Sequence, residues 1–344
     1  IKKNKQYKNL KFCTYKNFSK VIYKLKGKNF CIDNLTCSIS NESIISKSFG
    51  IKLKIDPCYM MKSIKNKIEI KHTRDAHFKD GLALTKFIFW IKNINQKKIT
   101  EIEAKNKFEK FRRLNKDYLF PSFDTIAGTG SNGAIIHYRV NKKSNKVIKK
   151  NDIFLCDSGG QYNYGTTDVT RTICFSEQKK SIKDAFTNVL KGHIAVAQTN
   201  LNKINTGKKI DASARKFLNR DGLDYAHGTG HGVGFFLNVH EGPQSISKYN
   251  SVKIKEGMIL SNEPGYYKKG YYGIRIENLV YVKKNKKNLQ FENLTLAPIE
   301  AKLINYKLLS KSEKDYLFKY HLTIYSMYYK FLNVKERKWL ASLI

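Results

Sequence analysis

The sequence LCDSGGQYNYGTTDVTRT, residues 155–172, places two aspartates on either side of a glycine-marked turn. Asp157 ends the apolar run IFLCD and Asp168 opens the run DVTRTICF, so the pattern predicts two strands joined by a hairpin. Paired strands lie about 4.8 Å apart, which puts both carboxylates within reach of the same ions. Aspartates are also common at turns for local reasons, so a plain turn remains an alternative.

Three later motifs carry further candidates for metal binding. They are HGTGHGVG at 227–234, NEPGYY at 262–267 and GIRIEN at 273–278. With His231, Glu263 and Glu277, the two aspartates form a set of four carboxylates and one imidazole. Such an oxygen-rich set suits hard or borderline divalent cations. It indicates a metal-dependent hydrolase.

The GIRIEN motif has the alternation of a strand. Ile274 and Ile276 are expected on one face, and Arg275 and Glu277 on the other. A cation beside a carboxylate keeps it ionised and fixes its orientation, as a bridging metal ligand requires. A surface ion pair on an edge strand is the alternative.

Histidines gather around the same motifs. His227, His231 and His240 fall within a short glycine-rich segment, where the glycines disfavour a helix. Three histidines in such a segment favour a functional role over a structural one. His240 in NVHEGP and His137 in AIIHYRV are then expected to bind substrate or to stabilise charge without binding metal.

The remaining sequence reads as a mixture of helices and strands. Residues 1–60 alternate short apolar runs with polar breaks, as in an α/β domain. Apolar spacing predicts helices over 62–92, 100–114, 180–202, 210–220 and 310–332, with a cap near Ser63 for the first, and strands over 278–284 and 294–299 (LTLAPI). Between Pro121 and Gly273, glycines and β-branched runs predict strands and turns.

The composition of the chain limits the classes of function that it can have. The net charge of +37 would suit a polyanion partner, but lysines are scattered through nearly every segment and accompany abundant Asn and Ile. This distribution favours compositional drift, so we expect no nucleic-acid partner. The six cysteines show no framework spacing and are expected to be reduced, buried thiols of a cytoplasmic protein. The most apolar run, 82–91, is too short to cross a membrane.

Together these motifs resemble the catalytic domain of the Xaa-Pro aminopeptidases (aminopeptidase P). The resemblance extends over about residues 60–335 and includes KNKIEIKHTRDAHFKDGLAL, SNGAIIHY and the helix LKGHIAVA. It implies an α+β pita-bread fold, with a curved antiparallel sheet and outer helices. Residues 1–60 would end a creatinase-type non-catalytic domain, 61–282 would form the catalytic domain, and 283–344 its C-terminal strand and helical extension. The chain begins at Ile1, so we expect an N-terminally incomplete sequence.

The resemblance also implies roles for the site residues. Asp157 and Asp168 would bind one ion, Asp168 and Glu277 would bridge to a second, and His231 and Glu263 would complete the site. The two cations would be divalent, most commonly Mn²⁺, with Zn²⁺ or Co²⁺ as alternatives. His137, His227 and His240 match histidines that line the substrate site, Arg275 matches a supporting arginine, and Tyr267 matches an active-site tyrosine.

The implied reaction removes the first residue from peptides with proline at the second position. A hydroxide activated by both metals would attack the carbonyl, Glu263 would transfer the proton, and His240 and His137 would stabilise the charge that develops. The family also implies a homodimer. Prolidase and methionine aminopeptidase use the same kind of five-residue metal-ligand set, and a prolidase-type dipeptidase is one alternative. A catalytically inactive pita-bread module that binds nucleic acid or protein is the other.

Overall fold

The computed structural model describes residues 10–94 and 98–344, which form two compact units divided between Met61 and Lys62. The first unit holds two short parallel strands, β1 (Asn29–Ile32) and β2 (Gly50–Leu53), joined through helix α2 (Ile39–Ser46). Parallel strands need such a crossover connection. This small β-α-β arrangement agrees with the α/β domain predicted for the start of the chain.

The first unit has its own small core. Ile22, Ile32, Ile45 and Phe49 are buried together. Three short helical segments complete this part of the chain: η2 (Tyr15–Asn17), α1 (Phe18–Ile22) and α3 (Pro57–Ser63), the last of which crosses the division between the units.

Long helices frame the second unit. Helix α4 (Lys67–Lys92) begins later than predicted, because Ser63 belongs to α3 and Asn66 is the capping residue. Asn66 forms a capping box with Glu69, which satisfies the free N–H groups of the first turn. The other helices are α5 (Glu101–Arg113), α6 (Lys180–Ala197), α7 (Gly207–Asn219), α8 (Lys311–Tyr328) and α9 (Val334–Ala341). Each lies within a few residues of its predicted position, except for α9, which was not predicted.

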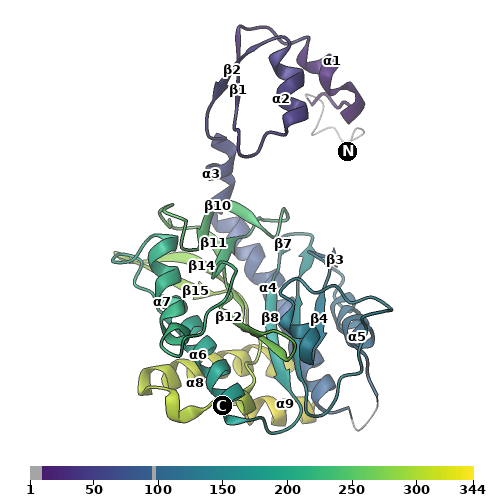
Figure 1. Cartoon of the computed structure of the whole chain (residues 1–344), viewed down its shortest axis with the longest axis vertical. Coiled ribbons are helices and arrows are strands. Elements are labelled where there is room, and N and C mark those ends of the chain that lie inside the picture. The colour runs from purple at the N-terminus through teal and green to yellow at the C-terminus, as the bar shows by residue number, and fades with distance from the viewer. Residues whose placement is uncertain (1–9, 95–97) are drawn as a thin grey trace. The chain divides into compact units, whose positions relative to one another are not determined.

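Antiparallel strands fill the middle of the second unit, with α6 and α7 on one side and α5 on the opposite side (Figure 1). One sheet has the order β4-β5-β8, another β3-β6-β7, and a five-stranded sheet the order β10-β9-β11-β14-β15, while β12 pairs with β13. The strands are β3 (Tyr118–Pro121), β4 (Ile126–Thr129), β5 (Ile153–Ser158), β6 (Gly160–Tyr162), β7 (Gly165–Thr166), β8 (Val169–Cys174), β9 (Gly230–Gly232), β10 (Glu241–Ile246), β11 (Ile259–Asn262), β12 (Gly265–Lys268), β13 (Tyr272–Arg275), β14 (Asn278–Asn285) and β15 (Asn288–Asn293). Helices outside antiparallel sheets match the predicted α+β class.

The strand predicted over 294–299 is wrong. The partner of β14 is β15, which ends at Asn293, and the following segment is extended but irregular. Its backbone is held by side chains of α8: the Ala297 N–H donates to the Tyr320 hydroxyl at 3.3 Å, and the Ile299 N–H to His321 Nε2 at 3.2 Å. The apolar side chains are therefore buried without a partner strand.

The cysteines and the apolar run at 82–91 can now be placed. All six cysteines are free, but only Cys156 and Cys174 are buried, and Cys13, Cys31 and Cys58 are exposed, so the expectation of buried thiols was wrong for these three. The run at 82–91 lies within α4. Among the described residues, no helix combines the length and apolar character that a membrane span needs.

Arg171 joins the strands of the second unit to the segment before α8. Its buried guanidinium donates to the carbonyls of Thr170, Glu277, Ala297 and Pro298 and to the side chains of Asn278 and Tyr320, at 2.6–2.9 Å. One side chain thus satisfies acceptors from β8, β14 and the irregular segment together.

Replacing Arg171 should therefore destabilise the whole second unit. Each buried acceptor left without a donor costs about 1–3 kcal/mol. We expect Arg171→Met to lower the free energy of unfolding in urea by about 3 kcal/mol or more. Lys314→Met, on the exposed face of α8, is the matched control and should change it little. Equal stability of the two variants would contradict this account of Arg171.

Candidate metal centre

Asp157 and Asp168 are brought together by the pairing of β5 with β8. Asp157 lies opposite Thr170 in the antiparallel register, and Asp168 directly precedes β8. The chain between them continues as the antiparallel pair β6–β7, and its two arms approach closely at Gly159, where a Cβ would lie 1.9 Å from the Thr167 carbonyl oxygen. Only glycine fits at that position. Both carboxylates are buried within the described structure.

Arg275 and Glu277 approach the same place from the end of β13. The alternation holds: Ile274 and Ile276 are buried in the core, whereas Arg275 and Glu277 line the cavity that contains the aspartates. Arg275 Nη2 donates to Asp157 Oδ2 at 2.6 Å. This bond fixes one aspartate oxygen and directs the other away from the guanidinium.

Thr170 connects the two sides of the site. Its hydroxyl accepts from Arg275 Nε at 3.0 Å and donates to Glu277 Oε2 at 2.7 Å. Arg275 therefore orients Asp157 directly, and it orients Glu277 through the Thr170 hydroxyl. Positioning by such outer contacts is typical of metal-binding carboxylates.

His231 and Glu263 complete the cluster from β9 and from the segment after β11. His231 Nδ1 donates to the Gly232 carbonyl at 2.9 Å, which leaves Nε2 as the unprotonated, ligand-capable nitrogen of the neutral ring. His231 Nε2 lies 3.5 Å from Asp168 Oδ2 and 3.5 Å from Glu263 Oε1. Ser261 accepts from the His231 backbone N–H and donates to Glu263 Oε1.

The ligand-capable atoms converge in overlapping groups. Asp157, Asp168 and Glu277 have oxygens within 4.8 Å of one another, and so do His231, Glu263 and Glu277 with one atom each. Asp157 Oδ1 is buried and has no hydrogen-bond partner among the described residues, so one acceptor in the cluster lacks a positive partner. An oxygen-rich, adjacent pair of groups fits two divalent cations.

Burial and neighbouring like charges shift the pKa values of the clustered carboxyl groups. Burial raises the pKa of Asp168 and of Glu277 well above their usual values, and the neighbouring carboxylates raise both pKa values further. Burial also raises the pKa of Asp157, although Arg275 opposes the shift. At Glu263 burial acts upward too, but the nearby histidines and arginine outweigh it and lower the pKa. The protein alone does not neutralise the cluster.

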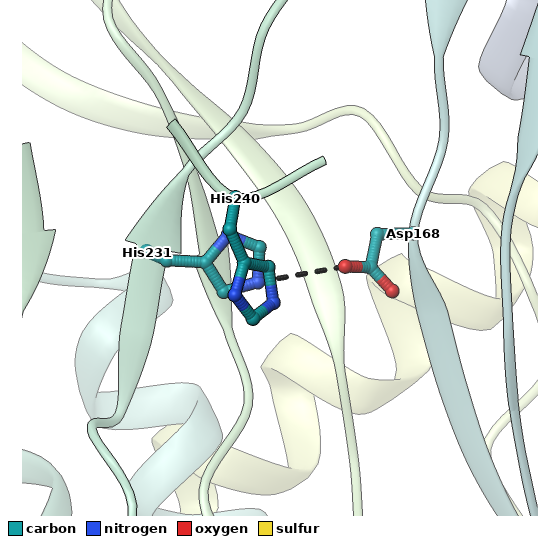
Figure 2. A group of neighbouring side chains, drawn as sticks. All are labelled: Asp168, His231 and His240. Carbon is teal, nitrogen blue, oxygen red and sulfur yellow. Dashed lines mark ion pairs between the residues drawn. The ribbon is translucent and has the colours of Figure 1, made fainter. Parts of the chain in front are cut away.

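His240 and His137 lie at the same cavity without belonging to the acid cluster. The His231 and His240 rings are 3.8 Å apart and both face Asp168 (Figure 2). His240 also has an atom within 4.8 Å of Asp168 and His231, so its geometry alone permits a ligand role. His240 is an exposed residue, but partial desolvation of its ring in the cavity and the neighbouring His231 lower its pKa to about 4, which keeps the ring neutral at physiological pH. His137 is exposed and lines the cavity.

His227 and Tyr267 form a chain that ends at Arg275. His227 Nδ1 donates to the Gly228 carbonyl at 2.7 Å, and its Nε2 is 2.9 Å from the Tyr267 hydroxyl. Arg275 Nη1 donates to the same hydroxyl at 2.6 Å. His227 lines the cavity, and the Tyr267 hydroxyl links it to Arg275, which lines the same cavity.

A cavity of about 500 Å³ opens over the cluster. All five predicted ligands line it, together with His137, His227, His240 and Arg275. Thr170, Ser261, Arg139 and the apolar residues Phe123, Ile136 and Val239 were not predicted. Thr170 was within the quoted motif, but only the three-dimensional pairing of β8 with the segment after β13 shows what its hydroxyl contacts.

A buried cluster of acids and an imidazole on antiparallel strands is the kind of site that metal-dependent hydrolases use. The chain belongs to metallopeptidase family M24, whose family model matches residues 71–284. A second model, the C-terminal region of peptidase M24, matches residues 287–343. The segment that Arg171 ties to β8 thus falls in this second region.

Curated relatives and solved structures agree with the family. A probable Xaa-Pro aminopeptidase P of Coprinopsis cinerea is 44% identical over 84% of this chain and 49% of its own length. An uncharacterised peptidase of Schizosaccharomyces pombe is 42% identical over 92% of this chain and 55% of its own. The chain thus spans about half the length of the curated relatives it matches.

Two solved structures show the likeness in three dimensions. An X-prolyl aminopeptidase from Caenorhabditis elegans, described as a cytosolic enzyme with a di-nuclear active site, superposes with a TM-score of 0.81 at 35% identity, covering 88% of this chain and 51% of that one. A prolidase from Pyrococcus furiosus gives a TM-score of 0.70 at 27% identity, covering 84% and 81%.

The raised pKa values predict an unusual response of the metal-free protein to pH. Because Asp168 and Glu277 have folded-state pKa values above their unfolded ones, the stability they contribute is full below about pH 4. It is lost as the pH rises through the raised values. At pH 7.5 in EDTA, Asp168→Asn should therefore raise the free energy of unfolding above that of the wild type, because the variant buries no carboxylate at this position.

Added Mn²⁺ should make the wild type more stable than Asp168→Asn. It should raise the melting temperature of the wild type, because a ligand that binds only the folded state stabilises it, and it should do little for Asp168→Asn. Asp315→Asn, at an exposed position on α8, is the matched control for both measurements. A metal-free Asp168→Asn variant less stable than the wild type at pH 7.5 would contradict this reading of the cluster.

Proposed function

We propose that this chain is the catalytic part of an Xaa-Pro aminopeptidase, which removes the N-terminal residue from peptides with proline at the second position. The observation that carries the proposal is the convergence of Asp157, Asp168, His231, Glu263 and Glu277 at one cavity. The resemblance to proteins described as probable Xaa-Pro aminopeptidases, and to a di-nuclear X-prolyl aminopeptidase, supports the substrate class.

The five clustered residues would hold two divalent cations. We propose Mn²⁺ for both positions, with Zn²⁺ or Co²⁺ as alternatives, because four carboxylates and one imidazole make a donor set rich in oxygen. Bound there, two such ions would supply Lewis acidity and would lower the pKa of a water molecule at the site. Arg275 and Thr170 would keep Asp157 and Glu277 oriented for this role.

Glu263 is suited to move the proton in the reaction. The neighbouring histidines lower the pKa of its carboxyl group, so it is ionised near neutral pH and can accept a proton. In the proposed step Glu263 takes the proton of the attacking water and passes it to the proline nitrogen as the peptide bond breaks. Ser261 Oγ holds Glu263 Oε1 in position at 3.2 Å.

His240 and His137 would stabilise the charge that develops on the substrate. Neutral His240 still carries one ring N–H, which can donate to the oxyanion of the tetrahedral intermediate. His137 lines the same cavity and would contact the carbonyl on the proline side. His227, Tyr267 and Arg275 would shape the substrate site through their hydrogen-bond chain.

We also propose the wider context that the family implies. Residues 1–60 would end a non-catalytic domain, 61–282 would form the catalytic domain and 283–344 its C-terminal extension. The protein would act in the cytoplasm as a homodimer. The cytosolic enzyme from C. elegans supports the location.

A prolidase-type dipeptidase is the second candidate, and the structural likeness to the P. furiosus prolidase supports it. Release of the first residue from an Xaa-Pro-Yaa tripeptide with Mn²⁺, compared with an Xaa-Pro dipeptide, separates the two. The proposal expects cleavage of the tripeptide. Cleavage of only the dipeptide would favour prolidase. No cleavage of either, together with tight RNA binding, would favour a binding module, which the charge of +37 also suits.

Removal of the Glu263 carboxylate should stop turnover. We expect Glu263→Gln to lower kcat on the tripeptide by about a hundredfold or more, because the variant loses its general base. Glu256→Gln, at an exposed loop position, is the control and should retain activity. A Mn²⁺-induced rise in melting temperature should be measured in each variant to show whether metal is still bound. Full activity of Glu263→Gln would remove Glu263 from this role.

A further inference from the structure

Arg139 lies on the cavity wall in a segment that is anchored from behind. Tyr138 is buried, and its hydroxyl bonds to Glu101 Oε2 at 2.9 Å and to Ser144. The residues on both sides of Tyr138, His137 and Arg139, are exposed and line the cavity. The buried tyrosine therefore holds the two flanking side chains toward the space above the metal cluster.

Arg139 differs from the other charged residues of this wall in having no partner. Arg275 is bound to Asp157, and Asp124, which also lines the cavity, forms an ion pair with Lys105. Arg139 makes no hydrogen bond or ion pair with any residue in the described parts of the chain. A guanidinium keeps its charge throughout the physiological range and binds carboxylates in a bidentate manner. The unpaired Arg139 guanidinium at the cavity wall is thus suited to bind an anionic group of the ligand.

We propose that Arg139 binds the free C-terminal carboxylate of a short peptide substrate. This inference rests on the proposed function and deepens it, by assigning a preference for small peptides over long or amidated ones. The cavity of about 500 Å³ falls in the range that encloses small ligands, so a peptide of a few residues ends inside it. The amino end of such a peptide would then lie beside the metal site, and its carboxylate would reach Arg139 on the cavity wall.

The contact acts on binding and not on the chemical step. The terminal carboxylate is not altered by the cleavage, so Arg139 stabilises the bound substrate and the transition state equally. Its loss should raise KM and leave kcat nearly unchanged. A residue with a merely structural role would not distinguish peptides by their terminus.

The test compares a tripeptide acid, Ala-Pro-Ala, with the same tripeptide as its C-terminal amide. With Mn²⁺ present, the wild type should show a lower KM for the acid. Arg139→Gln should raise the KM for the acid about tenfold to a hundredfold, as expected for a lost charge-assisted hydrogen bond, and leave the amide unchanged. Arg139→Lys should recover part of the difference. Lys142→Gln, an exposed neighbour outside the cavity lining, is the matched control.

Calorimetric binding of both peptides to Glu263→Gln, with and without Arg139→Gln, separates this inference from the proposed function. Tighter binding of the acid than of the amide, lost in Arg139→Gln, supports the inference. If the wild type binds the acid in this way but cleaves neither peptide, the proposed peptidase function is contradicted and the inference about Arg139 is not. Equal binding of acid and amide, or an equal loss of both in Arg139→Gln, would overturn the inference whether or not cleavage occurs.

Discussion

The structure depends on three buried carboxylates and a fourth, partly buried one that lie close to the Arg275 guanidinium. Asp157, Asp168, Glu263 and Glu277 share one cavity, and Arg275 is the cation that contacts them through a hydrogen bond to Asp157. Several like charges in a buried place are costly unless a positive partner is present. The raised pKa values of Asp168 and Glu277 are the consequence. Divalent cations would remove this cost, so we expect metal binding to stabilise the folded chain.

The backbone delivers these groups from separate parts of the chain. The β5–β8 pairing sets the two aspartates, β13 sets Arg275 and leads to Glu277, and β9 sets His231. Arg171 then ties β8 and the Glu277 backbone to the irregular segment before α8. The C-terminal region is thereby part of what holds the metal cluster in place, although it supplies none of the five candidate ligands.

Local patterns were enough to predict much of this arrangement. The hairpin around Asp157 and Asp168 follows from glycines and apolar runs, and the opposite faces of Ile276 and Glu277 follow from strand alternation. The roles of the residues and the pita-bread fold came from the resemblance to a known family. The segment 294–299 was assigned wrongly, since apolar alternation does not reveal that Tyr320 and His321 of α8 take the place of a partner strand.

Contacts between distant segments could not be predicted in the same way. Nothing in the sequence distinguishes Thr170 from the other threonines nearby. In the structure its hydroxyl forms hydrogen bonds with both Arg275 and Glu277, which lie more than a hundred positions away. Tyr267 was predicted to be an active-site tyrosine, and the structure adds the contacts of its hydroxyl with His227 and Arg275. Such outer contacts depend on side-chain direction in the folded state, which sequence spacing does not contain.

Calorimetric titration of the metal-free chain with Mn²⁺ tests the central claim most directly. Two ions per chain are expected, with uptake strongly reduced when both Asp168 and Glu277 are replaced by alanine. No uptake by the wild type, or the same uptake by the doubly substituted chain, would contradict the assignment of this cluster as a two-metal site.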